Sequence, residues 1–184
     1  MRSKSAGVSR RASGVPWSGV REMFDLAQRY EGAINLSVGE PDFPTPSYIV
    51  EAAFEAVKRG YTHYTPNAGL LEFREAAAGK LRRENGIEVE PAKEIIATVG
   101  AMGALALTML AVVDSGEEVL IPNPGFASYE AQVLLADGKP VPYPVREEYG
   151  FSLDMEALER LVTENTRAIL INSPANPTGA VLGE

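Results

Sequence analysis

The sequence lacks the residues on which several common kinds of site depend. Its 184 residues include no cysteine, which excludes disulfide bonds and any metal site or nucleophile built on cysteine. They include one histidine, His63, with no second histidine or well-placed acid near it in the sequence, so a structural role and no metal site are expected. The longest apolar stretch, residues 101–113, is well short of the roughly 20 residues that span a bilayer, so no transmembrane segment is expected.

Positive charge is the minority charge. The sequence has 17 lysines and arginines against 25 aspartates and glutamates, a formal net charge of −8, which argues against nucleic acid or an anionic membrane as a partner. The first fourteen residues differ, because they contain basic residues and no acidic one. No apolar segment of a signal peptide follows them, so they are interpreted as an N-terminal arm rather than a transit peptide, and a cytoplasmic location is expected.

Strand and helix patterns alternate in the second half of the sequence. Four β-type runs separated by three helical patterns predict an α/β fold with a parallel sheet and right-handed crossovers. The expected strands are 95–99, 118–121, 140–145 and 167–171, and the expected helices between them are 102–113, 126–136 and 154–162. Further helices are expected at 20–30, at 47–59 with Ser47 as N-cap, and at 70–85 with Gly86 after its end, together with a brief strand at the start of 34–46.

Three of the expected strands end in turns at the edge where open α/β sheets bind ligands. In TVGAMG, Gly100 permits a tight turn and the following helix starts with free N–H groups that could bind a phosphate. In PNPGFASY, Phe126 follows two prolines and opens a helix, and in ILINSPANPTG the amide of Asn176 is held between two prolines. Each turn alone also fits an ordinary role: a strand-to-helix turn, a ring packed at a helix start, or a proline-rich loop.

These motifs together resemble the class I/II aminotransferases of fold type I, which use pyridoxal phosphate (PLP), and within them the aspartate and aromatic aminotransferases. The resemblance rests on SPANPTG, with NPTG intact, and on GEPDF, YTPNAG, TVGAMG and PNPGFASY in the same order, and it runs from about residue 15 to the last residue. It implies a three-layer sandwich with a mainly parallel sheet. Residues 1–46 would then be the N-terminal arm and a small-domain segment, and residues 47–184 the first part of the PLP-binding large domain.

The resemblance also implies roles for particular residues around PLP. The backbone at Gly100, Ala101 and Met102 would surround the phosphate, although Ala101 and Met102 lack the side-chain donor that is frequent at those positions. Phe126 would stack on the pyridine ring. Asn176 would hydrogen-bond the 3′-oxygen, and the peptide bond that follows it is expected to be cis.

Two further residues are implied to act at the substrate and subunit boundaries of the site. Gly39 would lie against the substrate. Tyr64 would reach the cofactor phosphate of a second, identical subunit, so the complete site would exist only in a dimer. The only tryptophan, Trp17, is expected either to dock on the core of its own chain or to belong to an arm that reaches the neighbouring subunit.

The sequence has no residue that matches the lysine to which the family attaches PLP. The family places that lysine well after NPTG, whereas the five lysines here are Lys4, Lys58, Lys80, Lys93 and Lys139. The chain is therefore expected to be the first half of an aminotransferase, with no catalytic residue of its own and no activity alone. The isolated chain is also expected to be unstable or to associate, because its sheet would be incomplete.

The expected function of the full-length protein is transfer of an amino group from an L-amino acid to a 2-oxo acid. Two alternatives share the same half-site: a PLP lyase or synthase of the same fold, and a non-catalytic regulator domain that binds PLP or an amino acid. A nucleotide-binding α/β domain is a weaker alternative, because TVGAMG lacks the third glycine of the dinucleotide-binding motif.

Overall fold

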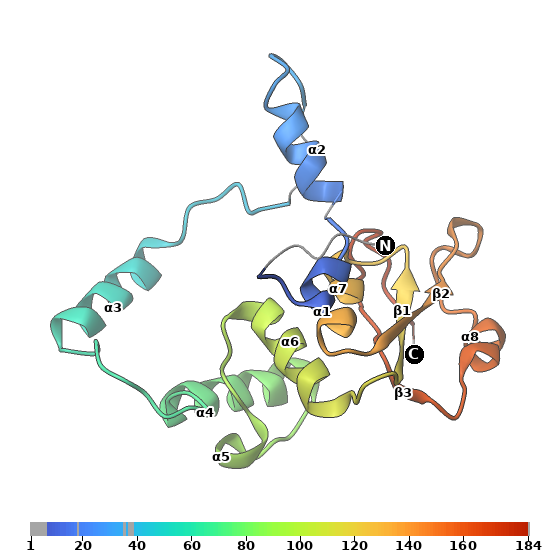
Figure 1. The fold of residues 1–184 in the computed structure, drawn as a ribbon. Helices are drawn as coiled ribbons and strands as arrows, with labels where there is room; N and C mark the ends of the chain where they lie inside the picture. Colours follow the sequence, from blue (N-terminus) through green and yellow to red (C-terminus); the bar gives the residue numbers. More distant parts are fainter. Residues whose placement is uncertain (1–6, 18, 35, 37–38, 184) are drawn as a thin grey trace. The chain divides into compact units, whose positions relative to one another are not determined.

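The computed structural model describes residues 7–17, 19–34, 36 and 39–183 (Figure 1). The chain divides into two compact units, one formed by Met1–Val38 with Met102–Glu184 and the other by Gly39–Ala101. The expected domain boundary after residue 46 concerns the full-length fold and stays a prediction.

The larger unit is built on a parallel sheet, as the alternation of patterns predicts. Its strands are β1 (Glu118–Asn123), β2 (Lys139–Pro144) and β3 (Thr166–Ile169), in the order β2-β1-β3. Helix α7 (Ser128–Leu135) connects β1 to β2, and α8 (Met155–Leu161), capped by the Asp154 side chain, connects β2 to β3 after a short 3₁₀ turn at Glu147–Tyr149. β2 has a proline at every second position, Pro140, Pro142 and Pro144.

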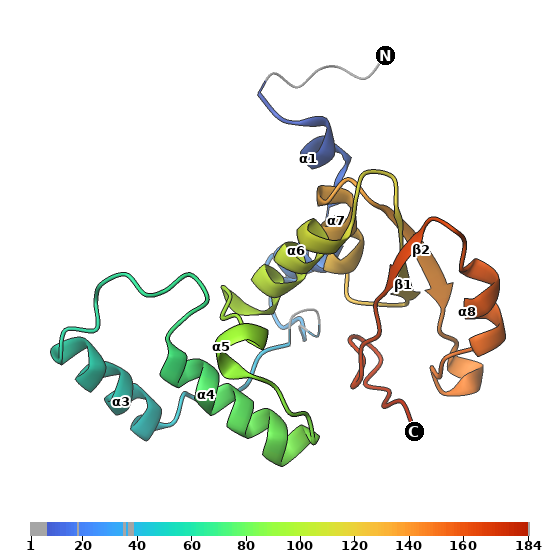
Figure 2. The same ribbon diagram turned by 90° about the horizontal axis from the view of Figure 1, so that it is seen from below.

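Helices cover both faces of this sheet, which gives three layers. Alternate residues of the central strand β1 point to opposite faces. Val119 and Ile121 pack with α7 and with Met109 of α6 (Gly100–Val112), whereas Leu120 packs on the other face with Tyr143 and with Leu158 of α8. Figures 1 and 2 show α7 and α8 on opposite sides of the sheet. The fold class predicted from the sequence is therefore observed.

The expected strand at 95–99 is absent, so the prediction of four strands was wrong and the sheet of the described residues has three. This run has no regular structure, and two of its apolar side chains face solvent: Ile96 is 66% exposed and Val99 is 93% exposed, whereas Ile95 and Ala97 are half-buried. A strand needs a neighbour to accept its hydrogen bonds, and no described strand lies beside this run. The apolar pattern alone is therefore not enough to make this run a strand.

Helix α6 is apolar all round, a pattern typical of a fully buried helix, but it is not fully buried. Only Met109 of α6 is buried, while Leu107 is 56% exposed and Leu110 is 61% exposed. One side of the helix packs on α7 and β1, and the other is left uncovered by the described residues. Trp17, at 95% exposure, does not dock on the core of this chain either.

The smaller unit, Gly39–Ala101, is helical. It contains α3 (Ser47–Lys58), α4 (Leu71–Lys80), a π-helical turn η1 (Leu81–Asn85) and α5 (Pro91–Glu94). Gly86 follows η1 with φ +67°, as expected, but the expected cap at Ser47 is wrong: α3 starts at Ser47 after Pro46, without a side-chain cap hydrogen bond. No strand occurs among residues 34, 36 and 39–46, and the rest of that expected strand lies outside the described residues.

The N-terminal segment before Gly39 contributes two short helices. They are α1 (Arg10–Gly14), whose N-cap Ser9 accepts from the N–H of Ala12, and α2 (Gly19–Ala27), which is shorter than the expected helix 20–30. Helix α1 was not expected, and it packs on α7.

A hydrogen-bonded carboxylate joins two strands and a loop at the amino-terminal edge of the sheet. Glu118 accepts from Lys139 Nζ at 2.7 Å and from the hydroxyl of Thr163 at 2.8 Å. The hydrogen bond from Lys139, then that from Thr163, lowers the pKa of Glu118 below its ordinary value of 4.5. A carboxylate with a lowered folded-state pKa stabilises the fold above its unfolded-state pKa, and this contribution is lost as the pH falls towards the folded-state pKa.

Glu118→Gln should therefore weaken the acid dependence of stability. In denaturant unfolding of the full-length protein, wild type should lose stability between about pH 5 and pH 3, and the variant should lose less over that interval. Glu88→Gln, at an exposed glutamate of the smaller unit, is the control and should retain the wild-type slope. Equal slopes for Glu118→Gln and Glu88→Gln would contradict the prediction.

Candidate functional site

The turn that starts α6 offers unpaired N–H groups. Gly100 has φ +65°, its N–H donates to the carbonyl of Thr98 at 2.8 Å, and the hydroxyl of Thr98 donates back to the carbonyl of Gly100 at 3.0 Å. These bonds close a tight turn from which α6 begins, and the first N–H groups of a helix have no partner within it. A Cβ added at Gly100 would meet no atom within 4 Å, so the space beside the turn is open. An anion can approach it.

The side chains at this turn are apolar and exposed. Ala101 is exposed and Met102 is 44% exposed, so neither adds a hydrogen-bond donor to the backbone groups. Gly39 and Tyr64 belong to the same unit as Gly100 and Ala101. Both are exposed, and Tyr64 is fully so.

A second turn, at the carboxyl end of β1, presents an aromatic ring. Phe126 is half-buried and packs edge-to-face on Tyr129, with ring centroids 5.5 Å apart. Phe126 lies two residues before the start of α7, directly before its N-cap residue Ala127. Gly125 is required at this turn, because a Cβ there would collide with the carbonyl oxygen of Pro122. The peptide bond between Asn123 and Pro124 is cis.

A third turn follows β3 and presents an amide. The N–H of Asn176 donates to the side-chain carbonyl of Asn172 at 2.9 Å, and the N–H of Gly179 donates to the carbonyl of Ala175 at 2.8 Å. The bond between Asn176 and Pro177 is cis, as expected, and so is that between Ser173 and Pro174. The backbone of the turn is thus fixed from within, while the Asn176 residue remains exposed.

The second and third turns meet at one edge of the sheet. Asn172 and Asn176 line a small cavity together with Pro122, Pro124 and Tyr143. The hydroxyl of Tyr143 donates to the carbonyl of Leu170 at 2.8 Å, which links β2 to the segment after β3. Burial raises the pKa of Tyr143, so this hydroxyl keeps its proton as a donor at neutral pH.

Phe126 and Asn176 are therefore placed on turns at the same edge, which agrees with the rule for parallel strands. Gly39, Tyr64, Gly100 and Ala101 belong to the other unit, and their convergence with these two residues stays a prediction.

The sequence of this chain matches the family described as aminotransferase class I and II over residues 31–184. The chain belongs to this family. The aminotransferase chain is 50% identical to aromatic-amino-acid aminotransferase 2 of Thermococcus litoralis over 95% of its length, and 52% identical to aspartate aminotransferase of Pyrococcus abyssi over 90%. It spans only 45% and 42% of those two proteins, respectively.

Solved structures give the same result for the fold. The aminotransferase chain matches Pyrococcus protein A1 with a TM-score of 0.91 and 51% identity, covering 94% of this chain and 44% of that one. It matches aspartate aminotransferase from Thermus thermophilus with maleate with a TM-score of 0.90 and 41% identity, covering 97% of this chain and 47% of that one. The fold is thus that of fold type I aminotransferases.

Sequence reasoning missed three residues that shape these turns of the aminotransferase chain. Gly125 is needed for a close approach, Asn172 holds the backbone of Asn176, and Tyr143 joins β2 to the segment after β3. The Pro-Gly pair at 124–125 is a turn signal that could have identified Gly125. The other two depend on contacts between segments.

Two negative findings apply to the part of the chain that the structure describes. It contains no group of three or more histidine, cysteine, aspartate or glutamate side chains that could hold a metal ion. None of its helices is both long and apolar enough to cross a membrane.

Proposed function

We propose that this chain supplies the N-terminal part of the cofactor site of a PLP-dependent aminotransferase, which transfers an amino group from an L-amino acid to a 2-oxo acid. The observation that carries the proposal is the turn after β3. Its backbone is fixed by Asn172 and its amide side chain, on Asn176, is left exposed at the ligand-binding edge of a parallel sheet.

The groups present fit the parts of PLP, the cofactor of this family. A phosphate dianion suits the N–H groups of the first turn of α6, where the helix dipole is positive and the space beside Gly100 is open. A flat ring suits the face of Phe126, and a phenolic oxygen suits the amide donor of Asn176. When bound, PLP supplies the carbonyl group and the electron sink that amino-group transfer requires.

The residues of this chain bind and orient, and they do not carry out proton transfer. The N–H groups of Ala101 and Met102 would hold the phosphate, and Phe126 would cover one face of the ring and exclude water from it. Asn176 would donate to the 3′-oxygen and favour its ionised form. Gly39 would lie against the substrate, and the space beside it is open, because a Cβ there would meet no atom within 4 Å.

The lysine that attaches PLP would come from the rest of the full-length protein. Four of the five lysines form ion pairs with glutamates away from the three turns: Lys58 with Glu55, Lys80 with Glu84, Lys93 with Glu90, and Lys139 with Glu118 of the neighbouring strand. Lys4 lies outside the described residues. This chain alone is therefore proposed to be inactive.

A second subunit would complete the site. Tyr64 is fully exposed on its loop, as expected for a side chain that reaches another copy. The amino acid and the 2-oxo acid are proposed as classes only, because the relatives named above act on aspartate or on aromatic amino acids according to their names.

The test uses the full-length protein with added PLP. We expect a visible absorption band that an L-amino acid bleaches, with release of the corresponding 2-oxo acid, and a return of the band when a second 2-oxo acid is added. The 184-residue chain alone should give no turnover. Failure to bind PLP would overturn the proposal. Product formation without amino transfer would identify a lyase or synthase instead, and PLP binding without product would identify a regulator.

A further inference from the structure

The smaller unit contains a close approach that demands glycine at one position. Gly69 has φ +92°, and a Cβ placed there would lie 2.7 Å from the Cβ of Ala97. The two residues are far apart in the sequence but belong to the same unit. Because the Cβ of Ala97 is attached directly to the backbone, relief of such a contact would require the backbone at Ala97 to move.

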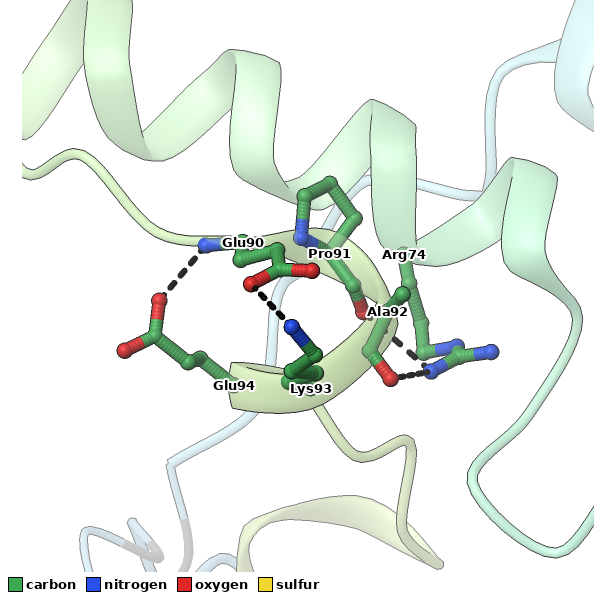
Figure 3. Close-up of polar contacts among 6 residues, drawn as sticks. All are labelled: Arg74, Glu90, Pro91, Ala92, Lys93 and Glu94. Carbon is green, nitrogen blue, oxygen red and sulfur yellow. Dashed lines mark hydrogen bonds and ion pairs between the residues drawn. The ribbon is translucent and has the colours of Figure 1, made fainter.

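Hydrogen bonds hold the same two segments together. The N–H of Ala97 donates to the carbonyl of Ala68 at 2.9 Å, next to Gly69. Further along α4, the buried guanidinium of Arg74 donates from Nη1 to the carbonyls of Pro91 at 3.2 Å and Ala92 at 3.1 Å (Figure 3). The segment from Pro91 to Ala97 is thus attached to the loop just before α4, at Ala68, and to α4 itself, at Arg74.

The two residues of this contact are close along the chain to two parts of the candidate site. Ala97 is three residues before Gly100, so the turn that would hold the phosphate lies at most about 10 Å of extended chain from the contact. Gly69 ends the loop that contains Tyr64. A shift at the contact would therefore be passed to both.

We propose that Gly69 is a positioning residue, which sets the place of the phosphate-binding turn at Gly100 through its contact with Ala97. The proposal rests on the proposed function, because it assumes that this turn binds the phosphate of PLP. Gly69 touches no reacting group and acts only through Ala97.

Other glycines of the same unit allow the two effects of a substitution to be separated. Gly60 has φ +89° and Gly86 has φ +67°, but a Cβ at either would meet no atom within 4 Å. Alanine at Gly86 therefore has only the cost of a left-handed backbone. Alanine at Gly69 has that cost and also displaces Ala97.

The experiment measures dissociation constants of the full-length apoprotein for PLP and for pyridoxal, which lacks the phosphate. Gly69→Ala should weaken PLP binding about 10-fold relative to Gly86→Ala, which is within the range measured for coupled neighbours. Pyridoxal binding should change equally in both variants. The double variant Gly69→Ala with Ala97→Gly should recover most of the lost PLP affinity, because it removes the collision and keeps the backbone cost.

Each possible result of the binding experiment has a single interpretation. PLP affinity of Gly69→Ala equal to that of Gly86→Ala, or equal losses for PLP and pyridoxal, would overturn the role of Gly69 and leave the proposed function intact. A wild-type protein that binds no PLP would overturn both. If Gly69→Ala does not fold, Ala97→Val crowds the same contact from the other side without backbone cost. It should weaken PLP binding and not pyridoxal binding, and wild-type affinity for both would overturn the proposal.

Discussion

Replacement of Asn176 by alanine is expected to lower the PLP affinity of the full-length protein by about 10- to 100-fold. The estimate follows from the loss of one hydrogen bond to an ionised oxygen, which contributes about 1.5–3 kcal/mol. The backbone of the turn should survive the change, because the bond that fixes it is donated by the Asn176 N–H and accepted by Asn172. Equilibrium titration of the apoprotein with PLP measures the effect.

The same variant should change the pH dependence of the bound cofactor. In the proposed role, Asn176 would favour the ionised form of the oxygen to which it donates, so its removal should raise the pKa of that group. The absorption of the bound cofactor should then change at a higher pH than in wild type. Asn165→Ala is the control, because Asn165 is exposed and precedes β3 at the opposite edge of the sheet. Wild-type affinity and an unchanged pH midpoint in Asn176→Ala would contradict the assignment.

Gly125→Ala should destabilise the fold by about 1–3 kcal/mol, the usual cost of forcing an extra methyl group into a packed site. The added Cβ would collide with the carbonyl oxygen of Pro122, so the backbone between β1 and α7 must shift. Phe126 follows directly, and its ring packs on Tyr129. Because Phe126 is proposed to cover one face of the PLP ring, the shift should also weaken PLP binding. Denaturant unfolding and PLP titration of the full-length protein measure the two effects.

Gly14→Ala is the matched control for this substitution. A Cβ at Gly14 would meet no atom within 4 Å and the residue has no left-handed φ, so the change should stay within about 0.5 kcal/mol. If Gly125→Ala unfolds like Gly14→Ala and binds PLP like wild type, the turn at Gly125 does not depend on glycine and the reasoning is wrong.

The parts of the fold that sequence patterns predicted are those whose neighbours lie within the chain. The strands β1, β2 and β3 pair with one another, and Leu120 of β1 is fully buried between the sheet and α8. The apolar patterns at Val99 and Leu110 were equally clear, yet both side chains are exposed. Periodicity reports that a side chain requires an apolar neighbour, but it does not say whether that neighbour belongs to the same stretch of sequence.

The residues of the candidate site also differ in whether the sequence alone could predict them. Gly100, Phe126 and Asn176 could be proposed from the sequence because each follows an expected strand and matches a family motif. The Pro-Gly pair at 124–125 signals a turn that could have identified Gly125. Gly69 could not be identified in this way, because it is required by Ala97, which approaches from another segment. Such contacts become visible only once the chain has folded.

The prolines of β2 determine at which edge of this sheet a further strand can pair. The N–H groups of Lys139 and Val145 donate to the carbonyls of Glu117 and Asn123, so the odd-numbered residues of β2 face β1. The nitrogens of Pro140, Pro142 and Pro144 then face outward, where they have no hydrogen to donate. A further strand on that side would find carbonyl acceptors but no backbone N–H donors. Any further strand of the full-length protein would therefore pair with β3, and the proline edge of β2 disfavours pairing with a strand of another chain.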